Sequence, residues 1–208
     1  MSAIFLEIHP ENPESRKIKQ AVQIIKDGGL VIYPTDTLYG LGCDITNNKA
    51  VERVCRIKGI KPQKANFSFI CSDLSNIAFY TKPFSNSIYK SMRKNLPGPF
   101  TFILKASNQV PKMLKNNRKN VGIRVPNSPI VSQLLEGLEN PIISTSIKNI
   151  DDDITPYPTD PYTIYEEYKH LVDLVIDGGF GGNVPSTVID CTNNQPEIIR
   201  LGLGDLQY

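Results

Sequence analysis

A group of polar side chains follows the first buried strand that the sequence predicts. In the stretch VIYPTDTLYGLG, residues 31–42, an apolar run gives way to Thr35, Asp36 and Thr37, and Gly40 and Gly42 come soon after. Open α/β sheets bind ligands beyond the carboxyl ends of their strands, so these oxygens could hold a small polar substrate. The glycines would let the backbone approach such a ligand closely. The alternative is a local turn in which the same side chains bond their own backbone.

Three lysines recur at every third position in the loop after the next predicted helix. Lys58, Lys61 and Lys64 occur in RIKGIKPQKANFSF, residues 56–69. Three ammonium groups on one loop repel one another unless an anion lies between them, which favours a polyphosphate site. Ordinary solvated lysines on the surface are the alternative.

A single arginine interrupts a strongly apolar strand pattern. Arg124 lies in NVGIRVP, residues 120–126, so we expect its guanidinium to be partly buried. A buried guanidinium needs a carboxylate or a phosphate as its partner. That partner is either a carboxylate of this chain in a structural salt bridge or the carboxylate of a substrate.

Two other segments could contact a ligand. Ser144, Thr145 and Ser146 cluster at the end of a predicted strand. The segment DGGFGGNVPSTVID, residues 177–190, holds four glycines whose amides could cradle a phosphate. Its glycine spacing fits neither the P-loop nor the dinucleotide fingerprint, so the sequence excludes both of these motifs.

The charges are strongly segregated along the chain. The net charge is +2, yet residues 53–124 contain 15 lysines and arginines and one acidic residue, Asp73. The remainder of the chain holds 8 basic and 20 acidic residues. This pattern predicts one basic face or groove suited to phosphates. Lysines solvated separately on different helices are the alternative.

Composition limits the class of protein. With 208 residues, 40% apolar and 21% charged, the chain is expected to form one globular domain over residues 1–208. No apolar run of about eighteen residues predicts a membrane span, and the first residues lack a secretory pattern. The four cysteines have neither C-x-x-C spacing nor histidine partners, so we predict no zinc site and no disulfides. A cytoplasmic protein is expected.

Apolar periodicity and capping residues predict strands that alternate with helices, which is typical of an α/β domain with a mixed sheet. The predicted helices cover residues 14–28, 49–56, 85–95, 129–138 and 162–172, with a short one from Ser72. The predicted strands cover residues 30–33, 67–71, 101–105, 121–125, 142–146, 174–177, 186–191 and 197–201.

Taken together, these motifs resemble the YrdC/YciO family. YPTDTLYGLG, the lysine loop, LPGPFTFIL, VGIRVP, STS, DGG, PSTVID and IIRLG occur in the order and spacing of that family over nearly the whole chain. The segments RIKG and NFSFIC are more similar to the YciO branch than to the synthase branch. The resemblance implies a single YrdC-like domain with a twisted mixed sheet, flanking helices and an open, positively charged groove.

The resemblance also implies a function. In the synthase branch, L-threonine, bicarbonate and ATP form L-threonylcarbamoyladenylate with Mg²⁺, pyrophosphate is released, and the product serves the threonylcarbamoyl modification of tRNA. The expected small partners are therefore a nucleotide and an amino acid. The alternative is a protein of the YciO type that binds double-stranded RNA or tRNA and lacks synthase activity.

Family positions can be carried onto this sequence residue by residue. The threonine side would be formed by Thr35, Arg124 and Ser186. The nucleotide side would be formed by Lys58, Ser146 and Arg200.

Three positions depart from the synthase pattern. Cys71 stands where the pattern has a histidine after the basic loop, when the sequences are aligned on Asn66. Ile60 stands where the pattern has an arginine two residues after Lys58, and Lys61 or Lys64 could supply the missing cation without its planar fork. Lys148 stands where the pattern has an asparagine two residues after the serine of the S-x-N motif, and it offers an ammonium in place of an amide.

Overall fold

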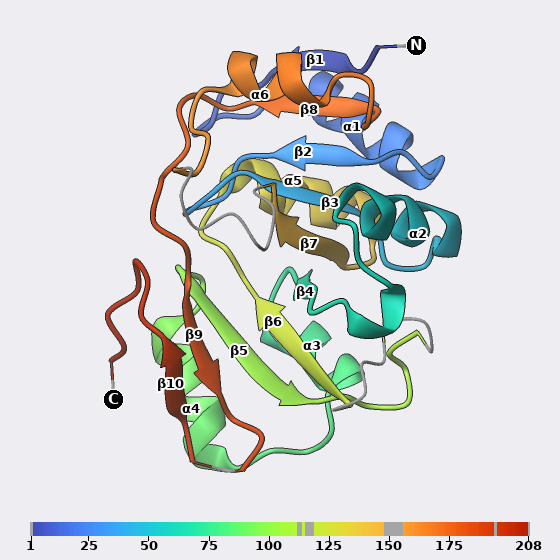
Figure 1. Cartoon of the computed structure of the whole chain (residues 1–208). Helices are drawn as coiled ribbons and strands as arrows, with labels where there is room; N and C mark the ends of the chain where they lie inside the picture. Colours follow the sequence, from blue (N-terminus) through green and yellow to red (C-terminus); the bar gives the residue numbers. More distant parts are fainter. Residues whose placement is uncertain (1, 112–113, 115–118, 148–155, 194, 208) are drawn as a thin grey trace.

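The elements of the fold follow from a computed structural model of the chain, which describes residues 2–207 apart from 112–113, 115–118, 148–155 and 194. Figure 1 shows their arrangement. The helices are α1 (Ser15–Lys26), α2 (Asn48–Ile57), the 3₁₀ turn η1 (Pro62–Lys64), α3 (Leu74–Tyr80), α4 (Asn86–Asn95), α5 (Pro129–Leu138) and α6 (Pro161–Tyr168). The strands are β1 (Ile4–Glu7), β2 (Val31–Tyr33), β3 (Gly40–Asp44), β4 (Ser68–Ile70), β5 (Phe100–Lys105), β6 (Asn120–Arg124), β7 (Ile142–Ser146), β8 (Leu174–Asp177), β9 (Thr187–Asp190) and β10 (Glu197–Arg200).

The described strands form one mixed sheet in the order β1-β8-β2-β3-β7-β4-β6-β5-β9-β10. The pairs β1–β8, β8–β2, β4–β6 and β5–β9 are parallel, and the other neighbours are antiparallel. Strand β8 lies between β1 and β2, and β9 lies beside β5, so segments far apart in the sequence become neighbours (Figure 1).

The two faces of the sheet pack against different helices, because successive side chains of a strand point to opposite faces. One face carries Ile32, Leu41 and Phe69 in a buried cluster with Val51 of α2 and Met92 of α4. The other face carries a second cluster, which packs beneath α1 and α5 and is formed in the strands by Val31, Tyr33, Ile70, Ile142, Leu174 and Ile176.

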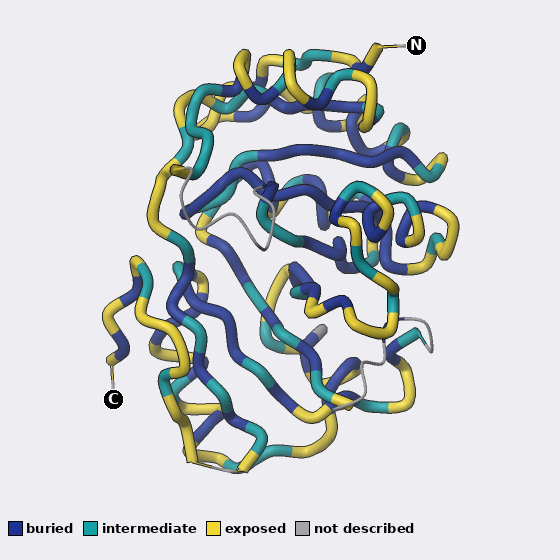
Figure 2. Tube along the Cα trace, viewed as in Figure 1, coloured by how far each residue is buried: buried dark blue, intermediate teal, exposed yellow. Residues whose placement is uncertain are grey.

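The second cluster covers only part of its face. None of its members comes from β3, β5, β6, β9 or β10. Figure 2 shows buried strands through the centre of the molecule and exposed positions along β10 at the edge of the sheet. A large part of this face is therefore open to a ligand.

Side-chain caps determine where several helices begin. The Asn47 side chain accepts a hydrogen bond from the backbone of Ala50 at the start of α2. Ser128 accepts one from Val131 at the start of α5, and Pro129 occupies the first helical position. Both arrangements satisfy amide groups that have no partner inside the helix.

The predicted α/β class with a mixed sheet is confirmed, and the bounds of α5, β7 and β8 agree with the prediction. Strands β1 and β3 were not predicted. Gly40 and Gly42, which the sequence pattern places in a loop, lie in β3 because β2 and β7 pair with them on either side. Glycine is a weak strand former, so local sequence gave no sign of this strand. Within the described residues, no helix is both long and apolar enough to cross a membrane.

Candidate functional site

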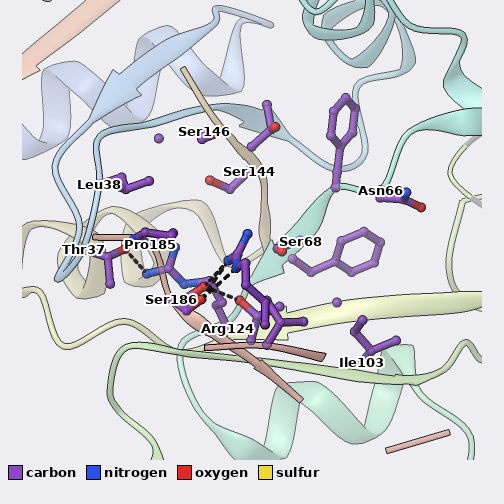
Figure 3. Close-up of a pocket in the computed structure, with 18 of the residues that line it drawn as sticks. Thr37, Leu38, Asn66, Ser68, Ile103, Arg124, Ser144, Ser146, Pro185 and Ser186 are labelled. Carbon is purple, nitrogen blue, oxygen red and sulfur yellow. Dashed lines mark hydrogen bonds between the residues drawn. The ribbon is translucent and has the colours of Figure 1, made fainter. Parts of the chain in front are cut away.

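A pocket of about 380 Å³ lies on the open part of the second face. Its volume is in the range of small-molecule sites. Seven strands and their loops contribute to its walls, and Figure 3 shows Ser68, Ser144, Arg124 and Ser186 around the cavity. The lining also includes the apolar side chains of Leu38, Phe67, Leu114 and Val121. The pocket thus combines a polar wall with an apolar one.

The floor of the pocket is a row of small residues across neighbouring strands. Ser144 of β7 pairs with Ser68 of β4, and Ser68 pairs with Gly122 of β6. Gly122 pairs in turn with Ile103 of β5, which pairs with Asp190 of β9. The small residues Ser144, Ser68 and Gly122 leave space above the sheet, and the serine hydroxyls offer hydrogen bonds within it.

Arg124 forms the structural salt bridge that was one of its two predicted roles. Its Nη2 donates to Asp36 Oδ1 at 2.8 Å and to Thr37 Oγ1 at 3.0 Å. Asp36 is held in place by the backbone amide of Asn127, which donates to its other oxygen. Arg124 also lines the pocket, and its side chain is only 12% exposed. Within the described residues its hydrogen bonds all run from Nη2, and Nε is buried without a partner.

Arg200 and Ser186 form a second polar contact in the pocket wall. Arg200 Nη2 donates to the carbonyl oxygen of Ser186 at 2.7 Å and to its Oγ at 3.3 Å. Ser186 Oγ lies 2.8 Å from Thr101 Oγ1. Burial lowers the pKa of Arg200, the neighbouring Tyr157 raises it, and the positive charge of Arg124 has a smaller lowering effect. The positive charges of the two guanidinium groups repel each other, so an anion bound near both of them would be stabilised.

Thr35 behaves as the turn alternative predicts. Its Oγ1 accepts from the backbone amide of Thr37 at 3.1 Å and donates to the Leu38 carbonyl at 2.7 Å. Thr37, and not Thr35, lies among the lining residues. Thr35 is 3.5 Å from Arg124 Nη2, so it belongs to the layer of side chains behind the pocket wall.

Lys58 and Ser146, which the family resemblance places on the nucleotide side, lie next to each other. The Lys58 Nζ donates to the backbone oxygen of Ser146 at 2.9 Å, and Ser146 lines the pocket. The lysine is buried, and burial lowers its pKa to about 8.

None of the three loop lysines lines the pocket, and Lys61 and Lys64 do not share the buried position of Lys58. Lys61 and Lys64 are exposed at η1 and are not lining residues, although Asn66 from the same loop is one. The three loop lysines therefore do not form one cluster. Lys148 lies outside the described residues.

The glycine-rich segment does not cradle a ligand in this pocket. A Cβ at Gly178 would meet Pro34, and one at Gly182 would lie 2.3 Å from the Thr37 carbonyl oxygen. These glycines allow the segment to pack against residues 34–39. Pro185, Ser186, Val188 and Asp190 are the members of this segment that line the pocket.

The basic block is divided between the two faces of the sheet. Arg124 lines the pocket, whereas Lys90, Arg93 and Lys94 are exposed on α4, which packs against the opposite face (Figure 1). The prediction that these cations share one face is wrong, because α2, α3 and α4 all pack against one face of the sheet, whereas the side chain of Arg124 points from β6 to the other.

Several lining residues were not predicted, among them Ser68, Thr101, Tyr157 and Asp190. Their signal is faint: Ser68, Thr101 and Asp190 are ordinary polar residues in short strands, and only the register of the sheet brings these three together.

Comparison with known proteins identifies the family. The family model for Sua5, YciO and YrdC, described as telomere recombination, matches residues 23–202. The chain belongs to this Sua5/YciO/YrdC family.

Relatives from both branches of the Sua5/YciO/YrdC family resemble the chain. It is 43% identical to the uncharacterised YciO of Escherichia coli over 98% of this chain and 97% of the relative, and the YciO crystal structure gives a TM-score of 0.89. It is 32% identical to threonylcarbamoyl-AMP synthase of Pyrococcus abyssi over 92% of this chain and 56% of the synthase. Crystalline P. abyssi Sua5, complexed with L-threonine, gives a TM-score of 0.85 at 30% identity, covering 96% of this chain and 58% of Sua5. The predicted resemblance to the YciO branch is confirmed.

Proposed function

We propose that this protein binds L-threonine and ATP in the pocket and joins them, with bicarbonate, into threonylcarbamoyl-AMP. The observation that carries the proposal is the pair of guanidinium groups, Arg124 and Arg200, on one wall of a hydroxyl-rich cavity. Such a pair suits a ligand with several anionic groups. The similarity to a P. abyssi synthase and to Sua5 complexed with L-threonine supports this choice of substrates.

The reaction would proceed in two balanced steps. The amine of L-threonine attacks bicarbonate, water leaves and a carbamate forms. A carbamate oxygen then attacks the α-phosphorus of ATP, the bond from this phosphorus to the bridging oxygen breaks, and pyrophosphate leaves with the bonding electrons. Negative charge develops on phosphate oxygens during the second step, so fixed cations and hydroxyl donors stabilise it.

On the threonine side, Arg124 would bind the α-carboxylate. Its bonds to Asp36 and Thr37 run from Nη2, so the donors of Nε and Nη1 are left for a substrate. Ser186 would contribute a hydroxyl beside it. Thr35 would act indirectly by holding Thr37 and the turn in place. These contacts position the reactants, and positioning accounts for most of the rate in this proposal.

On the nucleotide side, Arg200 would face the phosphates, and Lys58 at the end of α2 and Ser146 at the end of β7 would hold the nucleotide. Ile60 is uncharged where the synthase pattern has an arginine. Lys61, Lys64 or Lys148 would therefore supply a further cation when the nucleotide binds. A flexible ammonium fixes a phosphate less firmly than a planar guanidinium does. We therefore expect slower synthesis than the synthase pattern would give.

Mg²⁺ would accompany ATP rather than occupy a dedicated protein site. The described residues contain no group of three or more His, Cys, Asp or Glu side chains that could hold a metal ion. Asp190 is the one carboxylate among the described lining residues. Mg²⁺ often binds through one carboxylate, waters and substrate phosphates, so this residue set fits, and the ion would neutralise phosphate charge.

Radiolabelled bicarbonate tests the proposal directly. The full chain is incubated with ATP, L-threonine, Mg²⁺ and labelled bicarbonate, and pyrophosphate and labelled threonylcarbamoyl-AMP are measured together. We expect equal amounts of both products, dependent on threonine. Arg200→Ala should lower the rate at least tenfold, and Arg93→Ala on the opposite face should leave it within twofold. Absence of both products above an enzyme-free blank, at high enzyme concentration, would exclude this reaction.

A second candidate function is binding of duplex RNA or tRNA. Between Asp73 and Glu136 the sequence has no acidic residue, and Lys90, Arg93 and Lys94 are exposed along α4. Like charges three and four residues apart destabilise a helix, and a polyanion would relieve this repulsion. Affinity for tRNA should fall steeply as salt rises, and substitution of all three residues by alanine should flatten that dependence. Binding that is insensitive to salt would contradict this function.

A further inference from the structure

The Tyr33 side chain lies across β3 beneath the pocket. It pairs directly with Gly40 across β2 and β3, and a Cβ at Gly42 would lie 3.3 Å from its ring. Because both glycines lack a side chain, the ring lies across β3 toward β7. A Cβ at Gly40 would be 3.5 Å from the Tyr33 hydroxyl and 2.9 Å from Ser144 Oγ. Gly40 and Gly42 therefore make room for a tyrosine hydroxyl to reach the serine on the pocket floor.

The Tyr33 hydroxyl is fully buried, and its geometry falls short of a full hydrogen bond. Within the described residues, two buried side-chain polar atoms lack a partner at full hydrogen-bond geometry, Tyr33 Oη and Arg124 Nε, and both belong to the surroundings of this pocket. Poorly satisfied buried hydroxyl groups are costly and therefore rare in folded proteins. A side-chain interaction with Ser144 lowers the pKa of Tyr33 against the larger effect of burial, so the two hydroxyl groups already interact.

A protonated phenol and a serine hydroxyl can each donate or accept, so burial determines the direction of a hydrogen bond between them: Ser144 lines the pocket, whereas the buried Tyr33 hydroxyl does not. Burial raises the pKa of Tyr33 to about 12, so the phenol stays protonated near pH 7 and can donate. If Ser144 Oγ accepts this hydrogen, its own hydrogen must point elsewhere, and the pocket is the space that remains. Ser144 would then present a donor to the ligand, and only an acceptor atom would satisfy it.

We infer that Tyr33 positions the Ser144 hydroxyl to donate to an anionic oxygen of the bound ligand, so that this pair selects a carboxylate or phosphate oxygen at the floor of the pocket. The inference rests on the proposed function only for the choice of ligands. Tyr33 is a positioning residue, because it acts through Ser144 and does not itself line the pocket.

Two tyrosines provide a matched comparison. Tyr39 is also buried, but its hydroxyl donates to the Gly179 carbonyl at 2.7 Å and accepts from the Gly178 amide. Tyr39→Phe removes satisfied hydrogen bonds and should lower stability in urea. Tyr33→Phe removes a hydroxyl whose hydrogen bond geometry is poor and should therefore lower stability less than Tyr39→Phe does.

Calorimetric titrations with L-threonine and with ATP, measured separately, test the inference. We expect Tyr33→Phe to weaken binding of one of these ligands about tenfold, since one hydrogen bond to an anionic group is lost. Ser144→Ala should weaken the same ligand by a similar factor. The double variant should be within twofold of Ser144→Ala, because Tyr33 acts only through that serine. The affected ligand shows whether the oxygen belongs to a carboxylate or a phosphate.

Three results would overturn the inference. The first is that Tyr33→Phe binds both ligands with unchanged affinity. The second is that the fold-losses of affinity of the two single variants multiply in the double variant. The third is that the wild type binds neither ligand. If Tyr33→Phe and Ser144→Ala weaken the same ligand and the double variant matches Ser144→Ala, the role of Tyr33 is supported. If the wild type also releases no pyrophosphate, the proposed synthesis is refuted, and the role of Tyr33 is unaffected.

Discussion

Replacement of Lys58 by methionine should stabilise the protein at neutral pH and remove nucleotide binding. Burial lowers the pKa of Lys58 from 10.5 to about 8, so the folded state holds this proton less tightly than the unfolded state does. At pH 7 the shift corresponds to at most about 3 kcal/mol of destabilisation, since one pKa unit is worth about 1.4 kcal/mol. Loss of the hydrogen bond to the Ser146 carbonyl costs about 1 kcal/mol. The expected net gain is about 2 kcal/mol, reduced by whatever solvent reaches the ammonium.

The gain should depend on pH in a defined direction. A lysine whose folded pKa is lowered destabilises the fold below that pKa, and this cost is relieved as pH rises from about 8 toward 10.5. By pH 10 the cost should be about 1 kcal/mol, so the advantage of the methionine variant over the wild type should vanish.

Urea unfolding at pH 7 and pH 10, followed by circular dichroism, measures the difference in the free energy of unfolding between the Lys58→Met variant and the wild type at each pH. Lys61→Met is the control, because Lys61 is exposed in the same loop and its replacement should change stability by less than about 0.5 kcal/mol. A Lys58→Met variant that is less stable than the wild type at pH 7, or whose advantage is the same at both pH values, would refute the argument from burial.

Three further outcomes are expected. Gly40→Ala should lower the free energy of unfolding by about 1–3 kcal/mol, since its Cβ would lie 2.9 Å from Ser144 Oγ, and urea titration measures this loss. Arg124→Ala should weaken L-threonine binding more than Lys61→Ala does in calorimetry, because Arg124 is nearly buried in the pocket wall and Lys61 is exposed; equal affinities would contradict the assignment. Ser128→Ala should cost about 1 kcal/mol in thermal or urea unfolding, because α5 loses its cap, and a loss below about 0.3 kcal/mol would show that the cap contributes little.

The sequence predicts best where local signals agree. Helix α5 has a capping serine, a proline at its first position and an apolar stripe, and its bounds were predicted to the residue. Arg124 was found because a charge in an apolar strand requires a partner, and Asp36 is that partner. Strand β3 was missed because Gly40 and Gly42 have little intrinsic preference for a strand, and their neighbours in the sheet place them there.

The remaining site depends on contacts that no local pattern encodes. Ser68 and Thr101 are ordinary polar residues in short strands, and they line the pocket only because β4, β6 and β5 pair in one register. Thr35 and Thr37 were equivalent in the sequence, and the hydrogen bonds of the turn decide which of them reaches the cavity. The cations of α4 could not be separated from Arg124 without knowing which face of the sheet each element covers.

The position of β8 affects how this chain folds during its synthesis. Residues 174–177 must insert between β1 and β2, two segments that a ribosome releases far earlier. Until then, β1 has no partner strand and one edge of β2 is unpaired, and such distant pairing is slow to form. A nascent chain would therefore stay vulnerable to aggregation through most of its translation, and it would acquire Ser186 and Arg200 of the cavity only after that insertion becomes possible.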